Sequence, residues 1–167
     1  MTQVPVNNAA EAYQRYGPAL LRKAERVLRN EDDAMDIVQT LFLDLISRPP
    51  NSLDLAYLYS AVTNRCLNLI RNQVVRSRLL QDHAQDLCGA GRTTLGESLL
   101  TLELVTRLVG ELDQKSAEIV VYHFIDDLNQ TEVASQVGIS RRAVVKRLAK
   151  IRELARTFDR RDMEEMA

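Results

Sequence analysis

Apolar residues recur every three or four positions along most of the chain, which is the spacing of one face of an α-helix. A first run spans residues 13–27, and a second begins where Asn30 or Asp32 can cap a helix. The pair Pro49-Pro50 should end the second run, because proline lacks an N–H and disfavours helix in the residue before it. A third helix is predicted from near Asp54 to about Leu80. The positions predicted to face inward are Tyr13, Tyr16, Leu20, Ala24 and Val27, then Ala34, Ile37, Val38, Leu41, Phe42 and Leu45, and then Leu55, Leu58, Val62, Cys66 and Leu69.

Residues 82–97 interrupt this pattern. They contain three glycines and two threonines, and no apolar period persists, so we predict a flexible linker. Such a segment reaches at most roughly 50–58 Å when fully extended. Helices are predicted again over about 98–112 and after Asp113, which is a possible N-cap. The chain is therefore predicted to be all-α, with two small helical units at about 8–81 and 98–160.

The stretch NQTEVASQVGISRRAVVKRLAKIREL carries the most specific local pattern. Asn129 followed by Glu132 indicates a capping box that starts a short helix. Gly138 suits a sharp turn, because glycine tolerates a positive φ, and Ser140 can cap the helix that follows. Together with the small Ala134 where two helices must cross, this order is typical of a helix-turn-helix.

The second helix of this motif is basic on its outer face. Val144, Leu148 and Ile151 are spaced to face the core. Arginine can contact guanine through two hydrogen bonds and lysine can neutralise phosphate, so the helix fits a DNA major groove. The alternative is an ordinary helical hairpin with a solvated basic face. The outward positions and the capping serine are Ser140, Arg141, Arg142, Val145, Lys146 and Arg147.

The charge of the chain is compatible with DNA binding only when it is counted segment by segment. The 167 residues carry 22 Lys and Arg against 23 Asp and Glu, and a net charge of -1 argues against a simple basic nucleic-acid binder. Residues 31–46, however, hold five acidic and no basic groups, whereas 128–160 hold eight basic and three acidic groups. Blocks of opposite sign suggest separate surfaces for separate partners, although solvated helix faces would give the same totals.

The acidic block lies on the outer face of the second predicted helix. Metal binding or carboxylate catalysis there would need a histidine or an Asp-rich loop with a central glycine, and neither is present. Acidic residues near a helix start can simply favour the macrodipole, and a protein-docking face is the alternative. The residues of this face are Asp33, Asp36, Gln39 and Thr40.

The third predicted helix offers polar and basic side chains instead. Such side chains suit a nucleic-acid backbone and exposed bases. They are Asn64, Arg65, Asn68, Arg71 and Arg76.

Other chemistry is poorly represented. No apolar run approaches the ~20 residues of a membrane span, and the N-terminus lacks a signal-peptide pattern. His83 and Cys88 have no second pair of ligands for zinc, and Cys66 is expected to behave as a small apolar residue. We therefore expect a cytoplasmic chain that is not an enzyme and has no catalytic residues, bound metal or cofactor.

Three stretches, in order, resemble the extracytoplasmic-function (ECF, group 4) sigma factors of the sigma-70 family. NEDDAMDIVQTLFLDLI is similar to the family's polymerase-binding helix, AYLYSAVTNRCLNLIR to the helix after it, and the helix-turn-helix to the domain that reads the -35 promoter element. The matching positions are Asp33, Ala34, Asp36, Val38, Gln39 and Phe42, then Leu58, Asn64 and Arg71, and then Glu132, Val133, Ala134, Gly138, Ile139, Ser140, Val144, Arg147 and Leu148.

The resemblance implies a role for each part of the chain. Residues 8–81 would be sigma domain 2, which docks on the β′ clamp helices of core RNA polymerase and engages the -10 element. Residues 98–160 would be sigma domain 4, which binds the β flap and the -35 element. Promoter DNA and an anti-sigma factor would be further partners, without direct membrane insertion. The implied docking residues are Asp33, Asp36, Gln39 and Thr40, the implied -10 residues are Asn64, Arg65, Asn68, Arg71 and Arg76, and the implied -35 residues are Ser140, Arg141, Arg142, Val145, Lys146 and Arg147.

The chain departs from the family pattern at several positions. Asp113-Gln114 stands where Leu-Pro is usual, Met35 replaces a glutamate, and Asn68 replaces an aspartate. These changes affect the expected promoter sequence more than the polymerase role. Two other functions stay open: a sigma mimic that sequesters an anti-sigma factor, and a stand-alone helix-turn-helix repressor. The mimic should lack the basic DNA face, and the repressor should bind a palindrome without polymerase.

Overall fold

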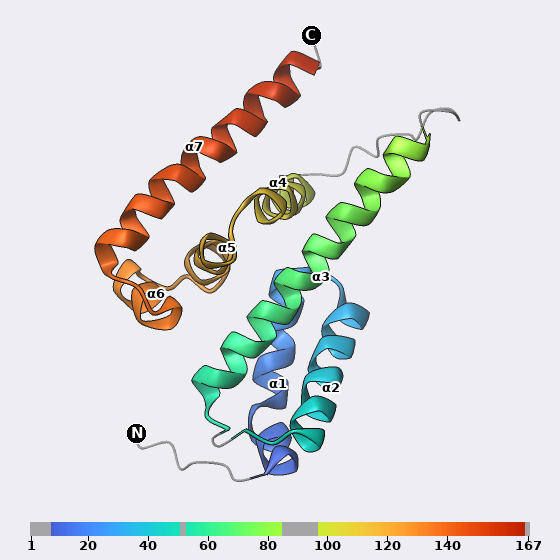
Figure 1. Ribbon diagram of the computed structural model, residues 1–167, viewed down its shortest axis with the longest axis vertical. Helices are drawn as coiled ribbons and strands as arrows, with labels where there is room; N and C mark the ends of the chain where they lie inside the picture. Colours follow the sequence, from blue (N-terminus) through green and yellow to red (C-terminus); the bar gives the residue numbers. More distant parts are fainter. Residues whose placement is uncertain (1–7, 51–52, 85–96, 166–167) are drawn as a thin grey trace.

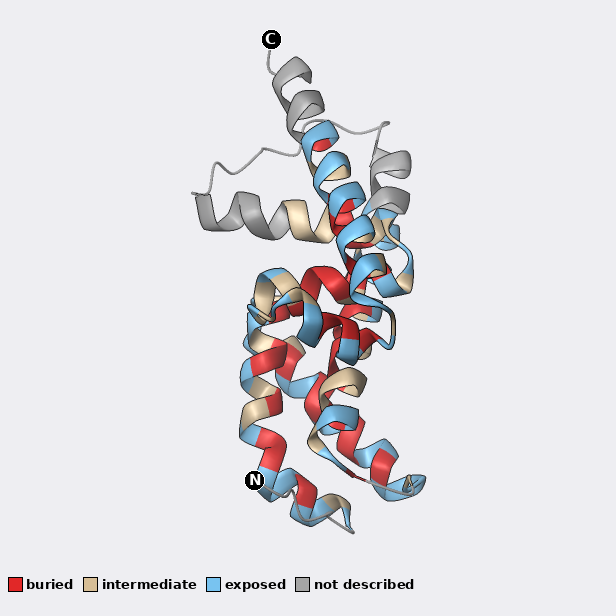
Figure 2. Cartoon of the chain, turned by 90° about the vertical axis from the view of Figure 1, so that its left-hand side faces the viewer, coloured by how far each residue is buried: buried red, intermediate tan, exposed pale blue. Residues whose placement is uncertain are grey.

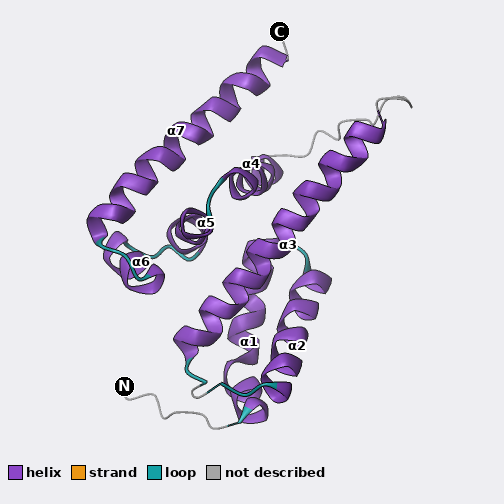
Figure 3. Ribbon diagram, viewed as in Figure 1, coloured by secondary structure: helices purple, strands orange, loops and turns teal. Residues whose placement is uncertain are grey.

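The computed structural model describes residues 8–50, 53–84 and 97–165. The secondary-structure elements of these residues are helices, so the all-α prediction is confirmed (Figure 3). Of the linker predicted at 82–97, residues 85–96, including Cys88, lie outside the described residues. The prediction is wrong at its two ends, because residues 82–84 continue the third helix and residue 97 begins the fourth. Within the described part of the chain, no helix has both the length and the apolar character that crossing a membrane requires.

The N-terminal unit consists of α1 (Ala9–Leu28), α2 (Glu31–Ser47) and α3 (Leu55–Ala84) (Figure 1). Asn30, not Asp32, caps α2, because its side chain accepts a hydrogen bond from the Asp33 N–H at 3.0 Å. The second helix ends before the two prolines, and the Asp54 carboxylate accepts a hydrogen bond from the Tyr57 N–H at 2.7 Å in the first turn of α3. Local sequence signals therefore set these helix boundaries.

The inward positions predicted for these helices form most of the core of the unit, coloured red in Figure 2. Leu20 and Leu58 are fully buried, and Leu67, which the helical spacing did not select, is buried with them. Tyr13 differs from the prediction, since it is 44% exposed. Its ring lies at the edge of the core and packs edge-on against Phe42, with the ring centroids 5.0 Å apart.

The C-terminal unit consists of α4 (Glu97–Glu111), α5 (Gln114–Val120), the π-helical turn η1 (Val121–Ile125), α6 (Gln130–Val137) and α7 (Arg141–Glu165). Asp113 caps α5 as predicted, accepting a hydrogen bond from the Ser116 N–H at 2.9 Å. The predicted capping box is also present: Asn129 Oδ1 accepts from the Glu132 N–H at 3.1 Å, and Glu132 Oε2 accepts from the Asn129 N–H at 2.8 Å. Gly138 ends α6 with φ of 68°, so the helix-turn-helix forms as its local signals indicate.

The two units pack against each other through α4 and α5, which lie between α3 and α7 (Figure 1). Val109, Ala117 and Val121 belong to the same buried cluster as the core of α1–α3. A second buried cluster joins α5, α6 and α7 inside the C-terminal unit. Because a small unit can bury only a limited core, packing of the two units on each other adds to the buried apolar surface of both.

Candidate nucleic-acid interface

The first turns of α7 present the basic surface predicted for the second helix of the helix-turn-helix. Ser140 caps the helix by accepting a hydrogen bond from the Ala143 N–H at 3.2 Å. Val144, Leu148 and Ile151 are at most 2% exposed and pack against α5 and α6. This buried row fixes the rotation of α7 about its axis, so the opposite face points to solvent. The exposed residues of that face are Arg141, Arg142, Val145 and Lys146.

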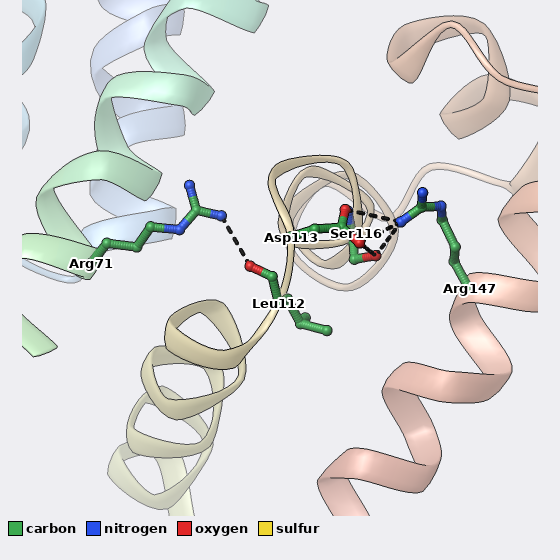
Figure 4. Close-up of polar contacts among 5 residues, drawn as sticks. All are labelled: Arg71, Leu112, Asp113, Ser116 and Arg147. Carbon is green, nitrogen blue, oxygen red and sulfur yellow. Dashed lines mark hydrogen bonds and ion pairs between the residues drawn. The ribbon is translucent and has the colours of Figure 1, made fainter.

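Arg147 differs from its neighbours on α7, because it turns toward α5 and is only 34% exposed (Figure 4). Its Nη1 donates to the two carboxylate oxygens of Asp113 at 2.9 and 2.7 Å and to the Ser116 hydroxyl at 2.6 Å. Burial alone would raise the pKa of the Asp113 carboxyl, but the Ser116 N–H and Arg147 hold it below the usual range. The outward orientation expected for Arg147 is therefore not the one observed.

A polar cavity of about 580 Å³ lies between the end of α2 and the first half of α3. Asn64, Arg65 and Asn68 line it together with the ring of Tyr57. Arg65 Nη2 lies 2.5 Å from Asp44 Oδ2, and this ion pair orients the guanidinium at the cavity wall. The cavity thus combines amide, guanidinium and aromatic groups, which together can hydrogen-bond and stack on an unpaired base.

Arg71 and Asn64 are turned toward the C-terminal unit. Arg71 Nη1 donates to Gln114 Oε1, and Arg71 Nη2 donates to the carbonyl oxygen of Leu112 at 3.3 Å, the second contact being drawn in Figure 4. Gln114 Nε2 in turn donates to Asn64 Oδ1 at 2.7 Å. Arg76, further along α3, is exposed. The predicted -10 residues of α3 are therefore divided between solvent and the other unit.

The sequence did not predict the contacts of Gln114 with Arg71 and Asn64. In the sequence, Gln114 was notable only because Asp113-Gln114 stands where Leu-Pro is usual. A polar residue at the start of a helix is ordinary, and its partners Arg71 and Asn64 are 43 and 50 positions away. The sequence therefore contains no signal that pairs these residues.

The acidic face of α2 is largely open to solvent. Asp36, Gln39 and Thr40 are exposed, and Asp33 is half-buried. The face continues into two exposed apolar side chains that the sequence did not single out, which are Leu43 at 63% and Ile46 at 65% exposure. Leu43 and Ile46 lie four and seven residues after Gln39, and this spacing in the sequence could have placed them on the same helix face as Gln39. Among the residues that the structure describes, no group of three or more His, Cys, Asp and Glu could hold a metal ion.

A buried ion pair between α1 and the residue that follows η1 joins the two units. Lys23 of α1, whose side chain is 2% exposed, donates to Asp126, which follows η1 and is 12% exposed. The Lys23 ammonium also lies 5.1 Å from the centroid of the Tyr59 ring and 4.9 Å from that of Tyr122. Burial lowers the pKa of Lys23, and the Asp126 carboxylate offsets part of that shift. Burial raises the pKa of the nearby Cys66 to about 12, so this thiol behaves as an apolar group.

Two family models match the chain, in the order of its two units. The model described as Sigma-70 region 2 matches residues 12–75, and the model described as Sigma-70, region 4 matches residues 102–154. The first range covers α1 from residue 12 onward, α2 and about two thirds of α3, and the second range includes the helix-turn-helix. No curated protein sequence matches the chain significantly.

Several solved structures are similar to this one, and two of them illustrate the likeness. CnrH, solved in complex with the cytosolic domain of CnrY, is 23% identical with a TM-score of 0.52, and the match covers 92% of this chain and 88% of the CnrH chain. The sigma factor RpoE, solved in complex with the anti-sigma factor NepR from Bartonella quintana, is 18% identical with a TM-score of 0.47, covering 91% of this chain and 96% of that one. The likeness to CnrH supports the fold.

Proposed function

The chain belongs to the sigma-70 family, as an ECF-type member that pairs region 2 with region 4, and we propose that it directs promoter-specific transcription initiation by bacterial core RNA polymerase. The observation that carries the proposal is the match to both regions in order, with an exposed basic helix in the second. We assign sigma domain 2 to 8–81, sigma domain 4 to 98–160 and the connection between the two domains to 82–97. Catalysis belongs to the polymerase, and the site of action is the cytoplasm.

We assign reading of the -35 element to the first turns of α7. The exposed Arg141 and Arg142 can each contact guanine in the major groove, and Lys146 can neutralise a phosphate. Val145, 44% exposed, offers an apolar contact to a thymine methyl group. Arg147 would join this set only after leaving Asp113, and Ser140 would position the helix end.

We assign the -10 element to α3 and to the polar cavity beside it. Asn64, Arg65 and Asn68 line a space of about 580 Å³, which is large enough to receive an unstacked base. The exposed Arg76 and, once freed, Arg71 would follow the nucleic-acid backbone along the same helix. This surface would help to hold the opened strand.

We assign docking on the β′ clamp helices to the outer face of α2, and a contact with the β flap to domain 4. An exposed row of polar and acidic side chains next to large exposed apolar ones is the composition of a protein interface with a polar rim. Leu43 and Ile46 would supply the apolar contacts. The polar and acidic residues of the row are the exposed Asp36, Gln39 and Thr40 together with the half-buried Asp33.

The test is transcription from a pool of genomic fragments by core polymerase with and without this chain. We expect new start sites only when the chain is present. Asp36→Arg should weaken binding to core polymerase about tenfold, because it reverses a charge in the docking face. The matched control is Glu153→Arg, which reverses an exposed charge on α7 and should bind normally.

The two readouts separate the parts of the proposal. A pool without new start sites would contradict the sigma-factor function as a whole. An unchanged affinity of Asp36→Arg for core polymerase would remove only the assignment of docking to α2.

We also propose an anti-sigma factor as a partner. CnrH, of similar fold, was solved with the cytosolic domain of CnrY. In this chain a cavity of about 650 Å³ lies between the two units, with Arg22 and Tyr59 on one side and Tyr122 and Leu128 on the other. A segment bound there would contact both units and oppose their separation.

Different observations weigh against the other two functions. A sigma mimic would not need the exposed basic residues Arg141, Arg142 and Lys146. A stand-alone repressor would not be expected to match Sigma-70 region 2 over residues 12–75.

A further inference from the structure

We propose that the turn Leu112–Gln114, between α4 and α5, is an intramolecular clasp. It occupies promoter-contacting side chains from both units, so the chain alone binds DNA weakly until the turn releases them. The inference rests on the proposed function, because it takes Asn64, Arg71 and Arg147 to be DNA contacts.

On one side the turn holds α3. The Leu112 carbonyl oxygen and Gln114 Oε1 accept hydrogen bonds from the two terminal nitrogens of Arg71, while Gln114 Nε2 donates to Asn64. Arg71 is half-buried in this position. Both side chains would have to give up these contacts before they could bind phosphate or a base edge.

On the other side the turn holds α7. Both carboxylate oxygens of Asp113 accept from Arg147 Nη1, and the Ser116 hydroxyl accepts from the same nitrogen (Figure 4). The carboxylate neutralises one of the cations at the start of the basic helix. A single turn therefore takes up one arginine from each DNA-facing surface.

These contacts cannot coexist with binding to both promoter elements. Arg71 and Arg147 bind neighbouring residues, whose Cα atoms are about 3.8 Å apart. The names of the -10 and -35 elements place them about 25 base pairs apart, which is about 85 Å of B-DNA at 3.4 Å per base pair. At least one arginine must leave the turn before both elements are occupied.

The chemistry of the turn departs from the pattern of the family that the chain resembles. A Leu-Pro pair, which is usual at this place in the family that the chain resembles, has no side-chain carboxylate or amide and could not make the contacts of Asp113 and Gln114. The clasp can also open, because each hydrogen bond near solvent contributes little net free energy and is replaceable by water or by DNA.

The test measures binding of the full chain, without polymerase, to a labelled single-stranded DNA pool of random sequence by fluorescence anisotropy. Gln114→Ala should bind about tenfold more tightly than the parent, the factor expected for losing one or two hydrogen bonds that compete with DNA. The matched control is Gln14→Ala, the same change at an exposed position of α1, which should bind like the parent. Adding Arg71→Ala to Gln114→Ala should abolish the gain.

The Arg147 side of the clasp is tested with a duplex pool. Asp113→Asn keeps a side chain that can cap α5 but removes the carboxylate, and it should bind more tightly than Glu153→Gln, which makes the same charge change at an exposed position of α7. Circular dichroism of each variant checks that the helices are retained.

Equal affinities of Gln114→Ala and Gln14→Ala, with both variants active in transcription with core polymerase, would overturn the clasp and leave the proposed function intact. An undiminished gain that survives Arg71→Ala would also overturn it, because the only group released by Gln114→Ala would then be the uncharged Asn64 and not the arginine that the clasp withholds from DNA. Failure of the parent chain to support any transcription with core polymerase would instead overturn the proposed function.

Discussion

The two basic surfaces of this chain differ in how they are built. On α7, Arg141, Arg142 and Lys146 stand exposed above a buried apolar row, and the cap, the glycine turn and the row lie within one short stretch of sequence. On α3, Arg71 and Asn64 are held by residues of the other unit. A surface specified by local signals is available in any arrangement of the units, whereas a surface held by distant residues depends on that arrangement.

The prediction with the largest expected effect concerns the buried ion pair that joins the two units. Asp126→Ala leaves the Lys23 ammonium, 2% exposed, without its carboxylate. We expect the free energy of unfolding to fall by about 3–5 kcal/mol, as is usual when one partner of a buried pair is removed. Urea denaturation measures the change.

The control is the double variant Lys23→Met/Asp126→Leu, which replaces the pair by apolar side chains and should recover most of the loss. If Asp126→Ala unfolds at the same urea concentration as the parent, Lys23 is not held between the units in solution.

The next test addresses the α7 surface alone. Arg142→Ala should weaken binding to the -35 element by about 1–3 kcal/mol at promoters where this arginine contacts a base pair, and transcription from those promoters should fall accordingly. Arg156→Ala is the matched control, because it removes an exposed arginine from the same helix about 21 Å further along. Transcription over a promoter set measures both variants. Full activity of Arg142→Ala at every promoter would exclude a reading role for this residue.

A smaller effect tests whether local backbone geometry builds the helix-turn-helix. Gly138 has φ of 68°, and a Cβ added there would meet nothing within 4 Å, so Gly138→Ala adds backbone strain without a clash. We expect a loss of about 1–2 kcal/mol in stability. In Gly17→Ala, the added Cβ lies 3.3 Å from the ring of Tyr13, which is exposed enough to shift. This control should change stability little in thermal unfolding, and equal effects of the two variants would contradict the prediction.

The smallest effect concerns pH. The pKa of Asp113 is lower in the folded chain than its ordinary value, so its contribution to stability is complete above about pH 4 and is lost as pH falls through the lowered value. Because the Asp113 side chain is 61% exposed, we expect its ionisation to contribute less than about 1 kcal/mol to the free energy of unfolding. Unfolding free energies of the parent and of Asp113→Asn should converge in acid, and parallel pH profiles would contradict this.

Sequence alone predicted the elements that short-range chemistry determines. Asn129, Gly138 and Ser140 each act within three or four residues, and the apolar spacing selected the buried Val144 and Leu148. The same rules predicted the helical stripes of α1–α3. These features need no information about the rest of the chain.

The contacts between the units were not predictable in the same way. Lys23 lies three residues after Leu20 and four before Val27, so a charged residue on the inward face was visible and required a partner. Asp126, however, is 103 positions away, and many acidic residues could have filled that role. The turn of Arg147 toward Asp113 was missed for the same reason.

The enclosure of Lys23 gives the molecule a natural chemical reporter. Its amine is shielded by Asp126 and by the rings of Tyr59 and Tyr122 while the units are together. We expect an acylating reagent to reach that nitrogen faster when the units part, because the side chain is 2% exposed while they are together. The extent of Lys23 modification, read by mass spectrometry against the exposed Lys146 and Lys150, would therefore count the fraction of open molecules.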